Sequence, residues 1–401
     1  MLAAQQQPVV DGAPRSGDLV EALRHGTFGG RLRYRLDYLE QDGKPEDALA
    51  STLRTELHYT TQDWHGLTAF VEVYANESLG ADDYFGITNG KSGAEYPLIA
   101  DPEGGGLNRG WLRWRDPGAR AEVVVGRQFL HWNDGRMLGN SFYRQNQNTF
   151  DAVRVTLRPA AGVEFDYAWL WRHDDVFFRS FGMDSHVAQL AWTVPERCRL
   201  AGYATWIDYD ARDTFDRDTY GVRLGGPYAL AQGLGLHYTL EYAHQSDAGD
   251  NPFDVDADYL VAELGVAFAG QLVYVGYNAV DGVRDPSTAL PFDQPAGYPY
   301  PFRGETEQMV VTPAAGMQIV MLRALGPVPG APDFSWQLHL HHFAQQVGGL
   351  DYGTDLGVQL AYAPAGRGWS VFAKAARYWA DDAASGAVDT TRLLLGAEIT
   401  F

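Results

Sequence analysis

Apolar and polar side chains alternate with a period of two along almost the whole chain from Gly26 onwards. In residues 27–39, one face of an extended chain carries four charged side chains, Arg31, Arg33, Arg35 and Asp37, and the other face carries leucines and tyrosines. Successive side chains of a β-strand point to opposite faces, so this alternation predicts a strand with one polar and one apolar face. The pattern recurs in 18 segments between residues 27 and 401.

The connections between these segments alternate in length. Those after even-numbered segments are short, such as Asp-Pro-Gly at 116–118, whereas those after odd-numbered segments are long and acidic, the longest being about 78–106, 130–148 and 280–315. Short periplasmic turns and long extracellular loops are typical of outer-membrane barrels. We therefore predict an all-β fold, a transmembrane antiparallel up-and-down β-barrel of 18 strands over residues 26–401. Residues 1–25 are predicted to be a periplasmic lead-in with one short helix.

Composition separates a barrel from a helical membrane protein. No segment has the roughly 18–20 consecutive apolar residues of a membrane helix, and the mean hydropathy is −0.27. A barrel strand looks only half hydrophobic, because its lumen face is polar. Aromatic residues make up 13% of the chain and gather near the ends of the predicted strands, where amphipathic rings meet the membrane–water interface.

Several function classes are disfavoured by the sequence. The net charge of −20 argues against a nucleic-acid partner. No G-x-S-x-G, HExxH or phosphate-binding glycine loop occurs in a suitable context, so we predict neither an enzyme nor a cofactor. Residues 1–10 lack the basic and apolar regions of a signal peptide. We expect the chain to reach the bacterial outer membrane after removal of a signal peptide that this sequence does not contain.

Two segments resemble a known family. Residues 126–155 contain a GRQ strand, a DGR loop, an RQ pair and a TFD-x-VR strand, and residues 47–73 contain a TLRT hairpin-like pattern. In this order, and with the TPAAGM segment at 312–317, they are similar to the alginate-export-type family of outer-membrane proteins. The resemblance covers most of residues 25–325. It implies an 18-stranded monomeric barrel and, for the namesake members, export of a polyanionic polysaccharide through an arginine-lined constriction.

The parity of the strands predicts which charged side chains face the lumen. The cations are Arg31, Arg33, Arg35, Arg54, Arg109, Arg113, Arg115, Arg154, Arg158, Arg172, Arg223 and Lys374. The anions are fewer: Asp37, Glu56, Glu72, Glu164, Asp166, Glu241, Glu263 and Glu398. A net basic wall favours anions, because a low-dielectric wall focuses its field on the permeating ion. The alternative for any one residue is that wall charges pair and only brace the barrel.

From these sets we predict the residues that line the pore and set its selectivity. They are Arg33, Arg35, Arg54, Arg113, Arg127, Arg136, Arg144, Arg154, Glu56, Glu72, Glu164 and Asp166. Arg136 and Arg144 belong to the long connection after residue 128, which we expect to fold into the barrel mouth. Strict alternation puts Arg127 on the lipid face, but a bulge near Gly126 or a position near the rim would turn it inward.

The acidic run from residue 247 to 258 is the candidate for a metal site, through Asp247, Asp250, Asp254 and Asp256. Carboxylate oxygens suit Ca²⁺, but the run lacks the regular spacing and central glycine of an EF-hand. We expect a solvated loop that binds Ca²⁺ only adventitiously.

The sequence therefore predicts a passive, selective channel for anionic saccharides or small organic anions, with polysaccharide export as one form of that function. Its expected partners are the lipid bilayer, lipopolysaccharide and the permeating anion, and the barrel is expected to be a monomer. Two alternatives remain: a general porin for neutral or cationic solutes, and a plugged barrel with a binding or structural role.

Overall fold

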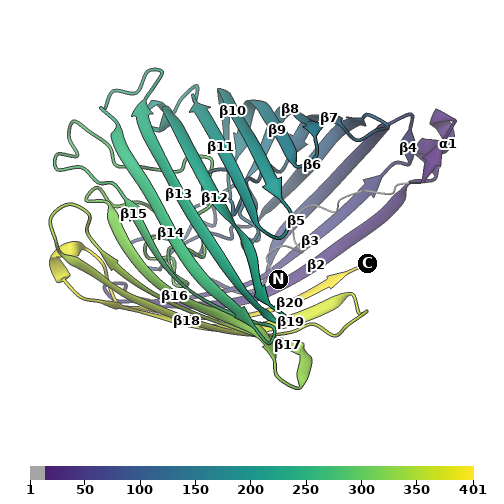
Figure 1. The fold of residues 1–401 in the computed structure, drawn as a ribbon. Coiled ribbons are helices and arrows are strands. Elements are labelled where there is room, and N and C mark those ends of the chain that lie inside the picture. Colours follow the sequence, from purple (N-terminus) through teal and green to yellow (C-terminus); the bar gives the residue numbers. More distant parts are fainter. Residues whose placement is uncertain (1–13) are drawn as a thin grey trace.

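The computed structural model describes residues 14–401, which form one closed sheet of 18 long antiparallel strands (Figure 1). The strands of the first half are β2 (Thr27–Gln41), β3 (Ala48–Thr60), β5 (Leu67–Asp83), β6 (Gly104–Arg115), β7 (Ala121–Gln128), β8 (Thr149–Ala160), β9 (Val163–Asp174), β10 (Ser180–Val194) and β11 (Cys198–Ile207). Those of the second half are β12 (Arg217–Ala231), β13 (Leu234–Asp247), β14 (Asp256–Phe268), β15 (Gln271–Val280), β16 (Met317–Val328), β17 (Ala331–Ala344), β18 (Asp351–Tyr362), β19 (Trp369–Ala380) and β20 (Thr390–Thr400). The predicted fold class is confirmed.

In the described part of the chain, five short elements lie outside the 18 long strands. Two-residue strands β1 (Arg15–Ser16) and β4 (Asp63–Trp64) pair in parallel beside the helix α1 (Leu19–Arg24). Single 3₁₀ turns lie at η2 (Asp213–Phe215) and η3 (Ala383–Ser385). The short helix expected in the lead-in is therefore present, whereas residues 1–13 of the lead-in lie outside the described residues.

The barrel closes where its first long strand meets its last. β2 pairs with β20 in antiparallel register, Arg31 opposite Thr400. The backbone N–H of Gly30 donates to the carbonyl of Phe401 (2.8 Å), and the N–H of Phe401 donates back (3.0 Å). A closed sheet leaves no unpaired edge, which is the condition for strands to cross a lipid bilayer.

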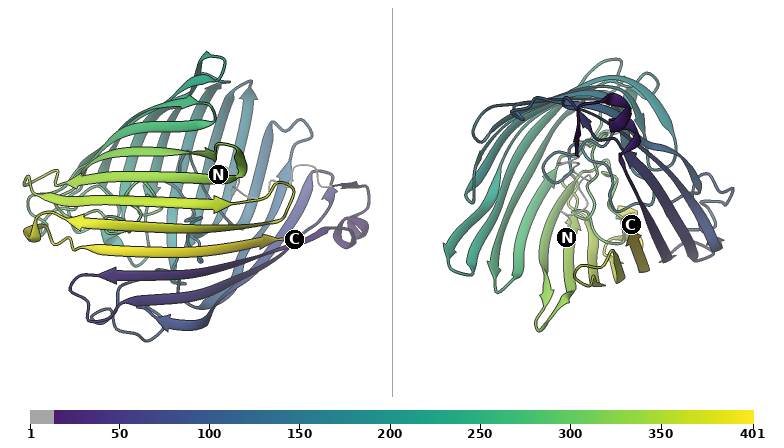
Figure 2. Two further views of the ribbon diagram at one scale, coloured as in Figure 1. Left: turned by 90° about the horizontal axis from the view of Figure 1, so that it is seen from below. Right: turned by 90° about the vertical axis from the view of Figure 1, so that its right-hand side faces the viewer.

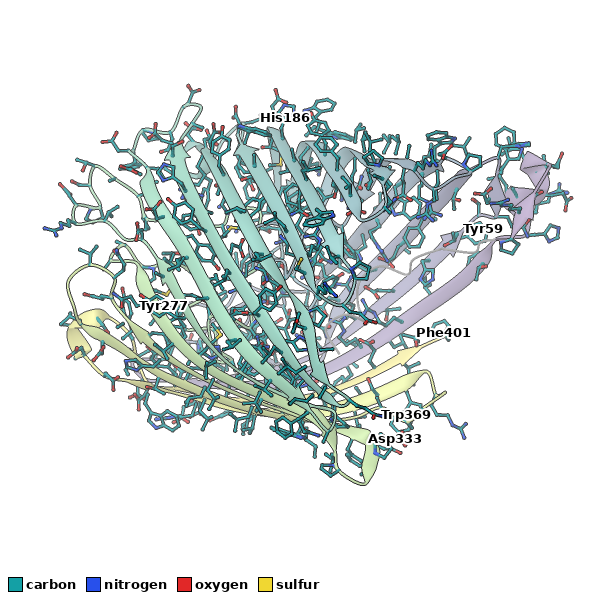
Figure 3. All side chains as sticks on the ribbon, in the orientation of Figure 1. Tyr59, His186, Tyr277, Asp333, Trp369 and Phe401 are labelled. Atoms are coloured by element: carbon teal, nitrogen blue, oxygen red, sulfur yellow. The ribbon has the colours of Figure 1, made fainter. Side chains whose placement is uncertain are left out.

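Large apolar side chains cover the outside of the barrel. They include Leu112, Leu190, Trp192, Leu240, Leu264 and Val320, all exposed. Tyr59, Trp369 and Phe401 lie at the end that carries the short turns (Figure 3). An exposed apolar surface of this extent suits lipid as its neighbour. No helix within residues 14–401 is both long and apolar enough to cross a membrane.

Two of the long connections, residues 129–148 and 281–316, fold into the barrel (Figure 2). Leu130, Trp132 and Leu138 from the first, with Phe292 and Met309 from the second, belong to one buried cluster with apolar wall residues. The N–H of Gly139 donates to Ala296 (3.0 Å) and that of Tyr298 donates to Gly135 (2.8 Å), so backbone hydrogen bonds join the two loops. We call them the first and second inner loops.

Candidate functional site

Lys374 is the point at which both inner loops meet the wall. This buried side chain on β19 donates from Nζ to Tyr143 Oη of the first loop (2.8 Å) and to Tyr300 Oη (2.9 Å) and Glu305 Oε2 (2.9 Å) of the second. The rings of Tyr143 and Tyr300 stack with their centroids 4.1 Å apart. One buried ammonium group therefore contacts both inner loops and fixes their positions relative to the wall.

The next strands of the wall continue this attachment of the second inner loop. Asp355 on β18 accepts hydrogen bonds from the N–H groups of Glu305 (2.8 Å) and Thr306 (3.0 Å). Arg392 on β20 contacts Glu307 (2.7 Å) and donates to Asp37 on β2 (2.9 Å). Residues 305–307 are thus fastened to three strands of the wall, β18, β19 and β20.

Arg144 and Arg136 lie inside the barrel, as the sequence predicted, and both are ion-paired. Arg144 is buried and bridges to Glu307. Arg136 donates to Asp134 (2.7 Å) in its own loop and to Glu263 on the β14 wall (3.0 Å). Its guanidinium also lies 4.0 Å from the ring centroid of Phe302 in the second loop. These contacts brace the two loops.

Most other wall charges predicted to line the pore also form pairs. Glu56 lies between Arg31 and Arg54, and Arg54 Nε donates to it at 2.7 Å. The remaining pairs are Arg109 with Glu72 (2.7 Å), Arg154 with Asp166 (2.6 Å) and Arg158 with Glu164 (3.0 Å). Arg113 lies on the lumen face of β6, half-buried, with its guanidinium 5.7 Å from the Trp111 centroid. Bracing is thus the observed geometry for most members of the set.

Arg33 and Arg35, neighbours on the lumen face of β2, are also ion-paired, and like Arg136 and Arg144 each keeps a buried N–H group without an acceptor among the described residues. Arg33 donates through Nε to Glu398 (2.9 Å) and through Nη1 to the carbonyl of Arg144 (3.1 Å). Arg35 donates through Nη1 to Asp101 (3.1 Å), and its guanidinium lies 4.4 Å from the Tyr143 centroid. Among the described residues, no acceptor contacts Arg33 Nη2 or Arg35 Nε, although both atoms are buried. Buried N–H groups of this kind favour a ligand that brings an acceptor oxygen.

These two arginines border a cavity of about 590 Å³ under the inner loops. Its lining includes three cations (Arg33, Arg35, Lys374), three carboxylates (Asp134, Glu305, Glu398) and the rings of Phe142, Tyr143, Tyr298, Tyr300, Phe302 and Phe372. Each carboxylate already contacts a basic side chain, as Glu398 contacts Arg33, Asp134 contacts Arg136 and Glu305 contacts Lys374. The cavity therefore combines ion-paired carboxylates with aromatic faces, and Arg33 and Arg35 at its border each keep one N–H group without an acceptor.

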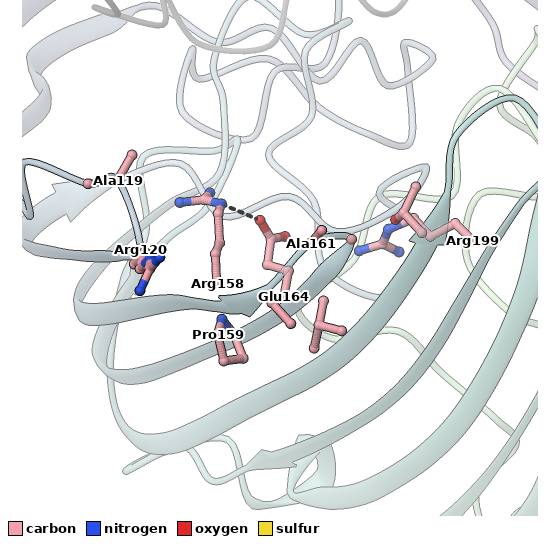
Figure 4. A pocket seen from close by; sticks show the side chains of 12 residues that line it. Ala119, Arg120, Arg158, Pro159, Ala161, Glu164 and Arg199 are labelled. Carbon is pink, nitrogen blue, oxygen red and sulfur yellow. Dashed lines mark hydrogen bonds and ion pairs between the residues drawn. The ribbon is translucent and has the colours of Figure 1, made fainter.

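A second, more open cavity of about 500 Å³ lies at the short-turn end (Figure 4). Arg120, Arg158 and Arg199 line it with Glu164, which bonds to Arg158 at 3.0 Å. Glu164, predicted to be a pore residue, thus belongs to the periplasmic mouth. Three arginines against one carboxylate make this mouth of the barrel basic.

Arg127 does not line the pore, and the inward rotation that we considered for it does not occur. β7 pairs in continuous register with β6 and β8, which places Arg127 opposite Gly110 and Asp151 on the outer face. There it bonds to Asp151 (2.8 Å) and Asp174 (2.5 Å) at the outer end of the strands. Its charge is tolerated because two carboxylates pair with it near the rim.

Arg172 was assigned to the lumen face and lies outside instead. Against β8 the register skips Trp171, because Arg172 lies opposite Asp151 and Leu170 lies opposite Ala152. A bulge inserts one residue and reverses the parity beyond it. Arg172 consequently pairs with Asp174 (3.0 Å) at the exposed surface.

The acidic residues proposed for a metal do not converge. Within residues 14–401, no group of three or more His, Cys, Asp or Glu side chains is arranged to hold an ion. Asp247 instead accepts a hydrogen bond from the backbone N–H of Val255 (3.1 Å), which shapes the loop.

Four residues that lie inside the lumen are not among the predicted pore residues. Arg392 and Asp355 lie on predicted strands, but those strands were assigned by their apolar faces. Glu305 and Glu307 lie in a connection that we treated only as an acidic external loop. Arg392 is separated from the predicted lumen residue Glu398 by an even number of positions on the same strand, so strand alternation alone could have placed Arg392 in the lumen.

Carboxylates of the inner loops are held in their ionised form. Burial alone would raise the pKa of Glu305, but Lys374 and His339 outweigh it and hold that pKa well below its usual value. For Glu307, burial is likewise outweighed by Arg144 and Arg392, so its pKa is lowered. Because their pKa values are lowered in the folded protein, the ion pairs that fasten Glu305 and Glu307 to the wall are fully formed above the ordinary carboxyl pKa of about 4.3. These ion pairs are lost as the pH falls through the lowered pKa values of the folded state.

Channel conductance should therefore be constant from pH 8 to about pH 5 and change only below about pH 4, where the loops begin to detach. Single-channel recordings in a planar bilayer at a series of pH values would measure this. Asp355 also holds the N–H groups of Glu305 and Thr306, so a transition centred between pH 5 and 7 contradicts the ionised state assigned to Glu305 and Glu307 only if it persists in Asp355→Asn.

Comparison with known proteins supports the barrel but not the family resemblance. No family model and no curated protein matches this sequence. Among solved structures, OccAB4 of Acinetobacter baumannii has a TM-score of 0.72 at 14% identity and covers 94% of this chain and 99% of its own. OccK9 (OpdG) of Pseudomonas aeruginosa has a TM-score of 0.73 at 13% identity, over 95% and 100%. OpdK of Pseudomonas aeruginosa, solved with vanillate, has a TM-score of 0.72 at 12% identity, over 93% and 98%.

These are Occ/Opd porin structures with an 18-strand barrel, and the likeness establishes the fold. The resemblance to the alginate-export-type family is not supported. Any large outer-membrane barrel alternates apolar outward with polar inward residues, so short polar motifs such as GRQ and DGR could not distinguish one family from another.

Proposed function

We propose that this protein is an outer-membrane channel that passes small organic anions through the cavity beneath its inner loops. The observation that carries the proposal is the pair of buried donors, Arg33 Nη2 and Arg35 Nε, at a cavity whose carboxylates are already ion-paired. A carboxylate would supply the missing acceptors, and the aromatic lining suits an apolar body attached to it. The vanillate in the OpdK structure is an aromatic carboxylate of this kind.

The size of the cavity favours a single small solute over a polymer. Its volume of about 590 Å³ falls within the roughly 300–1,000 Å³ of pockets for small molecules. Polysaccharide export, which rested on the unsupported family resemblance, thus has less in its favour than passage of small anions. A plugged barrel is the second candidate, because the inner loops share a buried apolar cluster with the wall.

Substitution of Arg33 and Arg35 by glutamine is expected to lower the ratio of anion to cation permeability by roughly twofold or more, since a low-dielectric wall magnifies the effect of each lumen charge. Reversal potentials in a planar bilayer under a salt gradient measure the ratio, with chloride and then with vanillate as the anion. Arg127→Gln combined with Arg172→Gln is the matched control, because it also removes two arginine charges, but from the outer face.

Three results would count against this function. Cation selectivity of the wild-type channel would favour the general porin, and absence of any conductance would favour the plugged barrel. An unchanged ratio in the Arg33→Gln, Arg35→Gln variant would reduce the two arginines to bracing residues.

A further inference from the structure

The helix α1 is fastened to the outer side of the barrel at the short-turn end. Tyr59 points outward from β3, because it alternates with the lumen residues Glu56 and His58. Its hydroxyl donates to the carbonyl of Leu23 (2.6 Å) and accepts from the N–H of Gly26 (2.8 Å). The N–H of Gln62, in the turn after β3, donates to Ala22 (3.0 Å). The C-terminal half of the helix is thus held against the outward face of β3.

The helix turns its apolar side chains away from the protein. Leu19, Val20 and Leu23 are 45%, 48% and 51% exposed, whereas Ala22 is 2% exposed and faces the barrel. Positions separated by three and four residues share one face of a helix, so the three large side chains form a single stripe. Glu21 lies on the opposite arc and pairs with His25 (2.9 Å), whereas Arg24 borders the stripe beside Val20.

This apolar stripe continues the lipid-facing surface of the barrel. Phe28, 80% exposed, follows the helix at the start of β2, and its ring lies 4.6 Å from that of Tyr59. Leu57 and Phe401, also exposed, lie beside it on β3 and at the end of β20. The helix therefore sits where the apolar belt of the barrel ends on the periplasmic side.

We propose that α1 is an interfacial anchor, with Leu19, Val20 and Leu23 inserted at the boundary between headgroups and acyl chains in the periplasmic leaflet. Amphipathic helices with an apolar face and a charged face lie in this plane. The phospholipid leaflet is the occupant because the stripe is continuous with a surface that already requires lipid. The anchor would fix the depth and tilt of the barrel, and the inference depends on the membrane location rather than on the cargo.

Site-directed spin labelling tests the proposal. Single cysteines replace Leu23 and, as the control on the opposite face of the helix, Glu21, in a background carrying Cys198→Ser because Cys198 is partly accessible. The labelled full-length barrel is reconstituted into vesicles of phosphatidylethanolamine and phosphatidylglycerol. Accessibility to oxygen, which partitions into lipid, and to a water-soluble nickel chelate is then measured at both positions. Heat-modifiable migration on gels confirms folding.

The label at position 23 is expected to be severalfold more accessible to oxygen than to the nickel chelate, with the reverse at position 21. Equal nickel accessibility at the two positions would overturn the anchor and place α1 in the periplasm. Protection of position 23 from both reagents would also overturn it, in favour of a protein partner covering the stripe. Because conductance is recorded separately, failure of the channel function would leave this result interpretable.

Discussion

Substitution of Lys374 by methionine is expected to destabilise the barrel by roughly 3–5 kcal/mol, the usual cost of removing one partner from a buried ion pair. The methionine fills a similar volume, so the loss comes from charge and hydrogen bonding rather than from a cavity. Glu305 would remain buried with its charge opposed only by the hydrogen bond from Tyr300 (2.5 Å) and by His339.

The same substitution should alter the channel. Lys374 donates to a residue of each inner loop, so its loss removes the contact that both loops share with β19. We expect larger and noisier single-channel currents, because the loops sample positions away from the wall. Urea unfolding in lipid vesicles and bilayer recordings measure the two effects on the same preparation.

A matched control and a second variant sharpen this test. Lys91 forms an ion pair with Asp83 (3.0 Å) in an exposed loop, where solvent screens the two charges, so Lys91→Met should change little. Adding Glu305→Gln to Lys374→Met removes the stranded charge and should restore part of the lost stability. A double variant less stable than Lys374→Met alone would show that the charge of Glu305 is stabilised by other groups.

The strands and their lumen face were largely readable from the sequence, for a physical reason. Each strand contacts lipid on one face and water or polar groups on the other. Apolar and polar residues therefore alternate with a period of two along the chain. Arg33, Arg35 and Arg154 were accordingly assigned to the correct face. The assignment failed at Arg172, because the bulge at Trp171 leaves no mark in the alternation of residue types.

The ion pairs that the lumen charges form could not be predicted from the alternation of residue types. The sequence shows Arg144 and Glu307 separated by more than 160 residues, and their pairing depends on how two loops fold. Counting strand residues alone gave a net basic wall, but loop carboxylates such as Asp101 and Asp134 pair with wall arginines. Loop conformation is set by such long-range contacts, which alternation along a strand does not encode.

Gly297 is the position where one side chain should separate the two inner loops. A Cβ at this residue would lie 1.9 Å from the carbonyl oxygen of Arg136 and 2.8 Å from its carbonyl carbon. The obstruction is backbone, so no side-chain rotation can relieve it. The hydrogen bonds on either side, from Gly139 to Ala296 and from Tyr298 to Gly135, depend on that close approach.

Gly297→Val should therefore break both loop-to-loop hydrogen bonds and widen the gap between the two inner loops while leaving the strands intact. The expected result is a higher single-channel conductance and weaker discrimination between vanillate and chloride, with the β-sheet circular dichroism unchanged. Gly202→Val is the control, since a Cβ at Gly202 on β11 would meet no atom within 4 Å. If Gly297→Val conducts as the wild type does, the permeating solute does not pass between the inner loops, and the route must run along the wall beside them.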